Sequence, residues 1–184
     1  MENSIFVVMC YELDYENALL VKQNLKELGI DEGDIHIIIG DNHKKIGKTV
    51  SYTLHQNFVN KVIPFVLEQE KNFYYVEANT IIFENPRYFP KYEPIHWLGF
   101  IHKWNHYIVG SHLVYFDFEK FKEMVRYINK LYIQHLDRLF KNLGEKYGME
   151  IDKTITQIRP HFSNNKQKIR KNTQYQINRN FYLP

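Results

Sequence analysis

The runs Ile5-Phe6-Val7-Val8-Met9-Cys10 (residues 5–10) and Ile35-His36-Ile37-Ile38-Ile39 (residues 35–39) decide the fold class of this chain. Both are short, apolar and rich in β-branched residues, which is typical of strands buried inside a parallel sheet. Between them, residues 15–28 place apolar side chains at helical spacing, and Gly29 follows as a helix C-cap. A strand, a helix and a second strand in so short a stretch predict a right-handed βαβ unit.

The same alternation of strands and helices continues along the chain. We expect a helix over residues 52–70, kinked or split at Pro64, and a third buried strand over residues 73–76. No internal repeat is apparent, so we predict a single α/β domain over residues 1–163 in which helices flank a mostly parallel sheet. The other expected elements are strand pieces at 81–83, 96–101 and 107–116, a surface connection at 86–94, and helices at 118–129 and 131–147 that end at Gly148.

Length and composition exclude several classes of protein. A chain of 184 residues with 44% hydrophobic content can bury one core. The single cysteine, Cys10, excludes an internal disulfide framework. No apolar run approaches the roughly 20 residues that a membrane-spanning helix needs, and residues 1–4 carry no basic signal-peptide region. We therefore expect a soluble protein of the cytoplasm.

Charge is distributed unevenly between the body of the chain and its end. After Asp152 the chain has seven basic and no acidic residues, which leaves 17 basic against 21 acidic residues in 1–152. We interpret residues 164–184 as a basic tail that faces an anionic group, such as a nucleotide diphosphate, a nucleic acid or a phospholipid surface. The alternative is a solvated, partly disordered terminus.

Polar residues follow each of the three expected buried strands. They are Tyr11-Glu12, Gly40-Asp41-Asn42 and Glu77-Ala78-Asn79. Ligands of open parallel sheets bind outside the carboxyl ends of the strands, so these residues predict a site for a small polar or phosphorylated ligand. The chain has no Walker-type phosphate loop, no GxGxxG motif after the first strand and no GxSxG motif. The spacing of its nine histidines resembles no closed zinc site.

Six short motifs between residues 54 and 162 occur in a particular order. They are Leu54-His55, Glu77-Ala78-Asn79, Trp97-Leu98-Gly99, Gly110-Ser111-His112-Leu113-Val114-Tyr115, Leu136-Asp137-Arg138-Leu139 and Arg159-Pro160-His161-Phe162. Their order and spacing resemble those of GT-A type glycosyltransferases of family 25, the lipopolysaccharide and collagen galactosyltransferase type. The resemblance covers about residues 5–163 and implies a GT-A, Rossmann-like nucleotide-binding fold. It also implies an enzyme that moves a sugar from a nucleotide-sugar donor, such as a UDP-sugar, to a hydroxyl acceptor.

The resemblance also implies roles for individual residues. An inverting transfer needs a carboxylate base, and Asp137 stands where the family has its late aspartate. Members of the family hold Mn²⁺ or Mg²⁺ at an acidic motif, whose place is taken here by Glu77-Ala78-Asn79, so we expect a weakly bound cation. The implied residues are Tyr11, Asp41, His55, Glu77 and Asn79 on the donor side, Gly110, His112 and Asp137 on the acceptor side, and Glu77, Asn79 and His161 as metal ligands.

The sequence leaves several alternatives open. The segment Glu77-Ala78-Asn79 can be a polar strand end only, Asp137 can be an exposed helix acid paired with Arg138 or Lys141, and the histidines can be structural. The acceptor can be a glycan, a protein or a hydroxylated base of viral or phage DNA, and the last would suit the basic tail. A viral enzyme of this kind would act in the host-cell cytoplasm. A third possibility is a catalytically inactive GT-A-like domain that binds a nucleotide or a partner.

Overall fold

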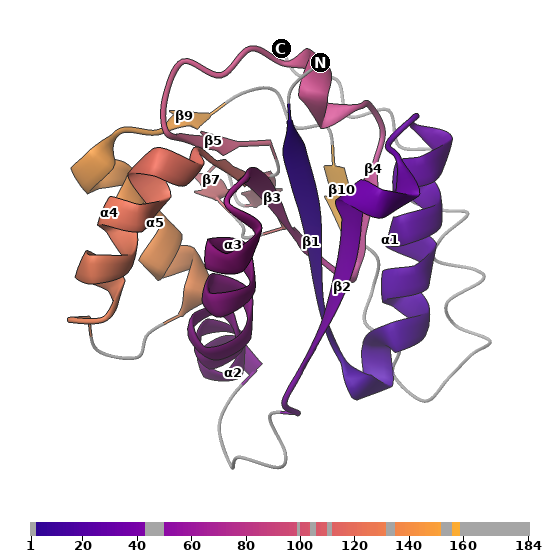
Figure 1. Ribbon diagram of the computed structural model, residues 1–184, viewed down its shortest axis with the longest axis horizontal. Helices are drawn as coiled ribbons and strands as arrows, with labels where there is room; N and C mark the ends of the chain where they lie inside the picture. The colour runs from indigo at the N-terminus through magenta and orange to yellow at the C-terminus, as the bar shows by residue number, and fades with distance from the viewer. Residues whose placement is uncertain are drawn as a thin grey trace.

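The computed structural model describes residues 3–42, 50–98, 100–103, 106–109, 112–131, 135–151 and 156–158 (Figure 1). These residues form a six-stranded sheet in the order β2-β1-β3-β8-β5-β9. Three of its five strand pairs are parallel, and β8 runs antiparallel to both β3 and β5. Helices cover both faces, which confirms the predicted single α/β domain with a mostly parallel sheet. The strands are β1 (Ser4–Tyr11), β2 (Ile35–Gly40), β3 (Asn72–Glu77), β5 (Ile95–Trp97), β8 (Leu113–Phe116) and β9 (Glu150–Ile151).

Strand β1 lies between β2 and β3 and is buried along its whole length. Its alternate side chains enter two separate apolar clusters, one on each face of the sheet, which is why the run is apolar without interruption. Helix α1 covers one face, and four helices cover the other (Figure 1). The helices are α1 (Tyr15–Glu27), α2 (Val50–Asn57), α3 (Ile63–Gln69), α4 (Phe118–Ile128) and α5 (Leu136–Tyr147).

The predicted βαβ unit is present as β1, α1 and β2. Strands β1 and β2 are parallel neighbours, with Phe6 opposite Ile35 and Tyr11 opposite Gly40. Helix α1 ends just before Gly29, whose φ of +83° lies in the left-handed region that glycine tolerates. The expectation that β2 is fully buried is wrong, because β2 is the edge strand and Ile39 is 50% exposed. A run of isoleucines has the same pattern in an edge strand as in a central one.

The expected break in the long helix is present, and it lies directly before Pro64. Helices α2 and α3 are joined by a π-helical segment, η3 (Phe58–Val62), without any intervening loop. Proline has no N–H and its ring crowds the preceding turn, so the wider π turn absorbs the mismatch. Phe58 and Val62 are buried, so the break also serves the packing of the core.

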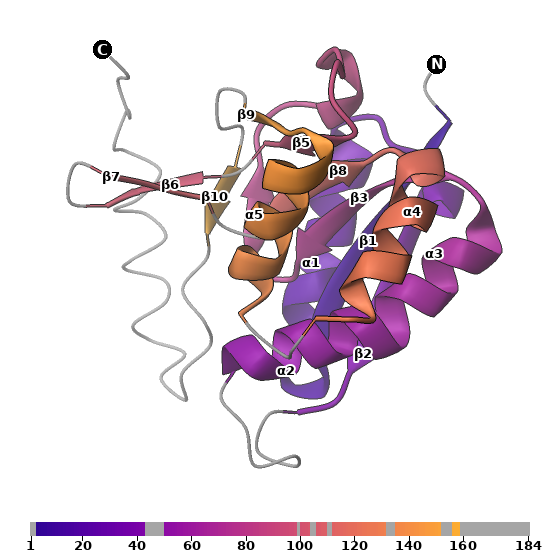
Figure 2. The same cartoon turned by 90° about the vertical axis from the view of Figure 1, so that its left-hand side faces the viewer.

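Residues 96–101 and 107–116, predicted as strands, are each divided in two. Strand β5 is followed by β6 (Phe100–Lys103), and β7 (His106–Val109) precedes β8. Within the described residues, strands β6 and β7 pair only with each other, and Figure 2 shows this hairpin extending away from the main sheet. The backbone N–H of Leu98 still donates to the Leu113 carbonyl, so the four pieces follow one interrupted hairpin. This continuity explains why the sequence pattern favours two long strands.

Two other expectations need adjustment. Strand β4 (Thr80–Ile82) does not continue β3 in the main sheet, but pairs antiparallel with β10 (Thr156–Ile158). Helix α5 begins at Leu136, five residues later than expected. It ends at Gly148 as predicted, and that glycine has a φ of +96°. The basic tail at 164–184 lies outside the described residues.

The connection at 86–94 lies at the surface as expected, with Tyr88 81% and Tyr92 77% exposed, and it also places two cations against rings on the α1 side of the sheet. It contains the short helix η4 (Pro86–Tyr88). The Arg87 guanidinium lies 5.5 Å from the centre of the Phe6 ring, and the Lys91 ammonium lies 5.4 Å from the Tyr74 ring and 5.6 Å from the Tyr115 ring. Such contacts combine apolar packing of the long stem with attraction of the cation to the ring face.

Candidate functional site

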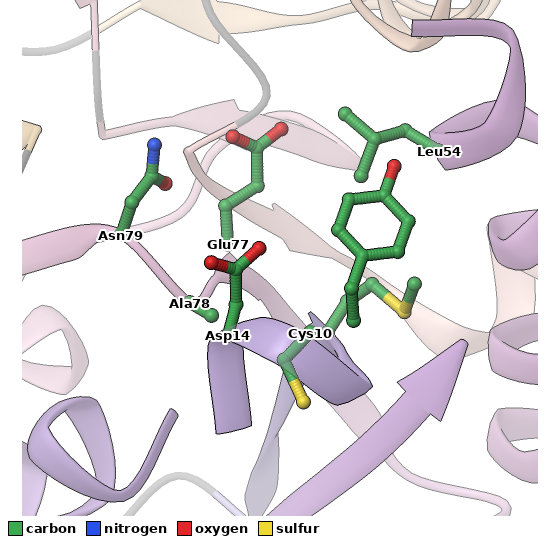
Figure 3. A pocket seen from close by; sticks show the side chains of 8 residues that line it. Cys10, Asp14, Leu54, Glu77, Ala78 and Asn79 are labelled. Carbon is green, nitrogen blue, oxygen red and sulfur yellow. The ribbon is translucent and has the colours of Figure 1, made fainter. Parts of the chain in front are cut away.

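A small cavity lies at the carboxyl ends of β1 and β3 (Figure 3). The two ends meet because Met9 is opposite Glu77 in the parallel register, and the Ala78 N–H donates to the Met9 carbonyl at 3.0 Å. The cavity has a volume of about 40 Å³, which is room for a few water molecules or the edge of a sugar ring. Its lining residues are Met9, Cys10, Tyr11, Asp14, Leu54, Glu77, Ala78 and Asn79. Three of the residues proposed from the sequence, Tyr11, Glu77 and Asn79, are therefore together.

Glu77 and His112 form a close pair beside this cavity. The distance between Glu77 Oε2 and His112 Nδ1 is 2.9 Å, and the two side chains are 11% and 13% exposed. The pair forms because β8 runs antiparallel to β3, with Val76 opposite Leu113. The His112 carbonyl is also fixed, since it accepts hydrogen bonds from the Glu77 N–H and the Thr80 hydroxyl, both at 3.1 Å.

In the hydrogen bond between these two side chains, His112 is the donor and Glu77 is the acceptor. Burial alone would lower the pKa of His112, but the charge and hydrogen bond of Glu77 and the charge of Asp137 raise this pKa above its usual 6.5. An ionised carboxylate only accepts hydrogen bonds, so Nδ1 of His112 carries the proton that it donates to Glu77. The Nε2 atom is then the ring nitrogen left for a ligand.

Asp137 lies in the first turn of α5, with its side chain exposed. Its negative charge contributes to the raised pKa of His112, which places it in the electrostatic neighbourhood of the pair. The pKa of the Tyr75 hydroxyl responds to charges from the same residues. This hydroxyl is fully buried and without a hydrogen-bond partner among the described residues, and burial followed by the charges of Glu77, Tyr11 and Asp137 raises its pKa well above 10. The fold thus brings Glu77 and His112 into contact, and the charge of Asp137 acts on the pKa of His112.

Asp41 follows β2 at the same edge of the sheet but does not line the cavity. Its backbone is fixed by the buried side chain of Asn57. The Asp41 N–H donates to Asn57 Oδ1, and Asn57 Nδ2 donates to the Asp41 carbonyl, both at 3.0 Å. A Cβ atom at Gly40 would lie 2.3 Å from Met9 Cε and 2.5 Å from the Asn57 amide, so a larger residue there would displace the Met9 and Asn57 side chains. The strand end that carries Asp41 is therefore rigid and one strand removed from the cavity.

His55 is buried in α2, while its neighbour Leu54 lines the cavity. Neither ring nitrogen of His55 has a hydrogen-bond partner among the described residues. Burial lowers the pKa of His55 below its usual 6.5, because the charged form loses its hydration.

This burial predicts a pH dependence of stability. The folded state resists protonation of His55, whereas the unfolded chain takes up the proton as the pH falls through 6.5. His55 therefore reduces the free energy of unfolding as the pH falls below that value, by at most about 1.4 kcal/mol per pH unit. We expect His55→Leu to lose less stability than the wild type between pH 7.5 and pH 5.5 in urea unfolding. An equal loss in both proteins would contradict the assignment.

Two of the residues proposed from the sequence, Gly110 and His161, lie outside the described residues. Besides the apolar lining of the cavity, two residues with polar groups were not anticipated, namely Asp14, which follows the end of β1, and Tyr75, which is buried in β3. The position of Asp14 in the short turn of helix directly after β1 was a usable signal. A tyrosine in an apolar strand gives no such signal, because it also suits an ordinary core.

The cation expected from the resemblance was tested against the side chains present. Within the described ranges, no group of three or more His, Cys, Asp and Glu side chains could hold a metal ion. Glu77 offers a carboxylate whose Oε2 already accepts from His112, and Asn79 offers a buried amide oxygen that has no hydrogen-bond partner among the described residues. These two donors fit a divalent cation only if the ligand supplies most of the remaining oxygens. In the same part of the chain, no helix has both the length and the apolar character to cross a membrane.

Comparison with solved structures identifies the fold. A glycosyltransferase involved in glycosylation of the major capsid of the virus PBCV-1 matches with a TM-score of 0.62 at 8% identity, over 94% of this chain and 99% of that chain. A mutant of Drosophila β-1,4-galactosyltransferase 7, in complex with manganese, UDP-Gal and xylobiose, matches with a TM-score of 0.55 at 14% identity, over 99% of this chain and 76% of that one. No protein-family model and no curated protein sequence matches the chain. The fold is that of GT-A glycosyltransferases, as the resemblance implied.

Proposed function

We propose that this chain is a glycosyltransferase that moves a sugar from a nucleotide-sugar donor to a hydroxyl acceptor. The observation that carries the proposal is the Glu77–His112 pair beside the cavity at the carboxyl ends of β1 and β3, where proteins of this architecture bind their ligands. Two solved glycosyltransferases of the same fold support it, one of them bound to UDP-Gal. The closer relationship to family 25 is part of the same proposal.

In the proposed reaction the configuration at the sugar is inverted. The Asp137 carboxylate accepts the proton of the acceptor hydroxyl as that oxygen bonds to the anomeric carbon. The bond from this carbon to the diphosphate breaks, and its electron pair leaves with the diphosphate. Tyr11, Asp41, His55, Glu77 and Asn79 form the donor side, and Gly110 and His112 join Asp137 on the acceptor side. The tail at 164–184 would place positive charge near the leaving diphosphate.

The proposed reaction includes a divalent cation that the protein binds only weakly. When bound, Mn²⁺ or Mg²⁺ would offset the negative charge of the diphosphate. Glu77, Asn79 and His161 are the proposed ligands, and Ala78 occupies the middle position with a methyl group that cannot coordinate. One carboxylate, already paired with His112, predicts weak binding of the cation.

Asn79→Asp should tighten Mn²⁺ binding in the presence of a nucleoside diphosphate. The substitution adds a second carboxylate beside Glu77 without changing the shape of the side chain, and hard cations prefer charged oxygens. Calorimetric titration of Mn²⁺ measures the change. Gln23→Glu is the control, because it adds the same charge on the exposed side of α1. Unchanged or weaker Mn²⁺ affinity in Asn79→Asp would show that residue 79 does not contact the cation.

The proposed function is tested by the thermal stability of the wild-type chain with UDP-, GDP- and CDP-sugars, each with and without Mn²⁺. A ligand at 100 times its dissociation constant adds about 2.7 kcal/mol to the free energy of unfolding. The absence of any shift at millimolar concentration would overturn the donor site. Binding without transfer to glycan, protein or hydroxylated-DNA acceptors would instead favour an inactive nucleotide-binding domain.

A further inference from the structure

The outer edge of β2 is open, since no strand among the described residues pairs with it. Strand β2 has six residues, whereas β9 at the opposite edge of the sheet has two. It contains neither lysine nor proline, residues that commonly keep edge strands from pairing. Its backbone N–H and C=O groups point alternately towards β1 and away from it. Figure 1 shows β2 between α1 on one side and α2 and α3 on the other, so its edge has room for a further strand.

Apolar side chains lie beside this edge on the α1 side of the sheet. Lys22 Nζ lies 2.7 Å from Oε1 of Glu32, which comes shortly before β2, so this face of α1 is turned towards β2. Leu19 and Tyr15 lie one and two turns before Lys22 on the same face, and they are 45% and 41% exposed. Ile39 continues this surface on β2 and is 50% exposed. The surface is therefore apolar and only partly covered.

A segment near the end of the sequence has the pattern of a strand with one apolar face. Residues 175–183 read Tyr-Gln-Ile-Asn-Arg-Asn-Phe-Tyr-Leu, in which apolar and polar side chains largely alternate. One face would carry Tyr175, Ile177, Phe181 and Leu183, together with the long aliphatic stem of Arg179. Such a strand is stable only where its apolar face is covered.

The path of the chain allows this segment to reach β2. The described residues end at Ile158, which is opposite Thr80 in the pairing of β10 with β4. Thr80 directly follows the site residue Asn79, so this point lies close to the carboxyl end of β3. Residues 159–174 span up to about 50 Å when extended. The outer edge of β2 is two strand spacings from β3, about 10 Å, so the linker is long enough.

We propose that residues 175–183 pair antiparallel with β2 as a seventh strand of the main sheet, with their apolar face over Tyr15, Leu19 and Ile39. The antiparallel direction follows from the path, because the segment then begins beside Gly40 at the carboxyl end of β2. The inference goes beyond the proposed function and does not depend on it, because it concerns the pairing of strands without any ligand.

Charge supports this occupant of the edge. The antiparallel strand leaves the basic run at residues 166–171 next to the exposed Asp41, and residues 1–152 carry more acidic than basic side chains. A second copy of β2 is a poorer occupant. When all six residues of two β2 strands pair antiparallel, Asp34 of one copy lies opposite Asp41 of the other, and like charges in that position are destabilising.

The test measures hydrogen exchange of the β2 amides by NMR in the full chain without nucleotide. Amides that donate to β1 should exchange slowly in every variant, and they report that the sheet is folded. The outward amides should also exchange slowly in the wild type, because they donate to the added strand. Ile177→Asp places a charge in the apolar face of the segment, so it should make the outward amides exchange at least about tenfold faster.

Two further pairs of variants serve as matched tests. Asn178→Asp adds the same charge to the opposite face of the segment and should leave the outward amides slow. Leu19→Asp should make them faster, whereas Leu20→Asp should not. Leu20 is 48% exposed, much like Leu19, but it lies on the side of α1 that meets β4, where Asn24 one turn later hydrogen-bonds the β4 backbone.

Fast exchange of the outward amides in the wild type would overturn the inference, and so would protection that survives in Ile177→Asp. Protection that increases with protein concentration, together with a dimer in sedimentation, would assign the edge to a second copy and would also overturn it. None of these results depends on the donor site, which the binding of nucleotide sugars tests separately.

Discussion

Asp137→Asn should lower the rate of sugar transfer by at least about a hundredfold while donor binding stays intact. The substitution keeps the shape of the side chain and removes its basicity, so the acceptor hydroxyl loses the group that takes its proton. The electrostatic grouping of Asp137 with His112 and Tyr75 is the structural basis of this expectation. A transfer assay and a donor-binding titration on the same preparation separate the two effects.

Glu145→Gln provides a control on the same helix. Glu145 is exposed and lies 3.6 Å from Lys141, an ion pair of the kind that contributes little to stability. Its loss should leave both transfer and donor binding near wild-type values. Near-normal transfer by Asp137→Asn would show that another group takes the proton. Loss of donor binding in that variant would show instead that Asp137 contacts the donor.

The central elements of the fold were predictable because each of their residue patterns fits only one kind of secondary structure. The apolar run of β1 needs burial on both faces, and helical spacing followed by Gly29 defines α1. The edge position of β2 was not predictable, since neighbouring strands in a sheet are set by the whole topology. The same holds for the β6–β7 hairpin, whose strands continue the pattern of β5 and β8.

The site was predictable to the extent that it follows from strand ends. Tyr11, Glu77 and Asn79 come together because β1 and β3 are parallel neighbours. The contact between Glu77 and His112 depends on β8 lying next to β3 in the opposite direction, and no local pattern encodes that register. Asp14 was missed because an aspartate before a helix already has an ordinary explanation as a cap, which the structure removes.

Arg87→Met should lower the free energy of unfolding by about 2–4 kcal/mol, the largest effect that we expect on stability. The guanidinium is 11% exposed and donates to Asp34 Oδ2 at 2.7 Å, to the Ser4 hydroxyl at 3.2 Å and to the Ser4 carbonyl. Methionine keeps an apolar stem against Phe6 but leaves these acceptors unsatisfied, and Ser4 is fully buried. The 26% exposure of Asp34 lets water recover part of the loss, so the expected value lies below that of a wholly buried pair.

The contrast with an exposed pair makes this prediction specific. Lys22 Nζ lies 2.7 Å from Glu32 Oε1, the same separation as in the Arg87 pair, but it lies on the surface. Lys22→Met should therefore change stability little. Urea unfolding of the two variants then compares a more buried ion pair with a more exposed one at the same separation of 2.7 Å. Arg87 contacts the first residue of β1, whereas the candidate site lies at its last, so folded Arg87→Met should bind nucleotide normally. Equal losses in the two variants would show that burial does not govern the contribution of Arg87, and a loss of binding without a loss of stability would place Arg87 in the functional site.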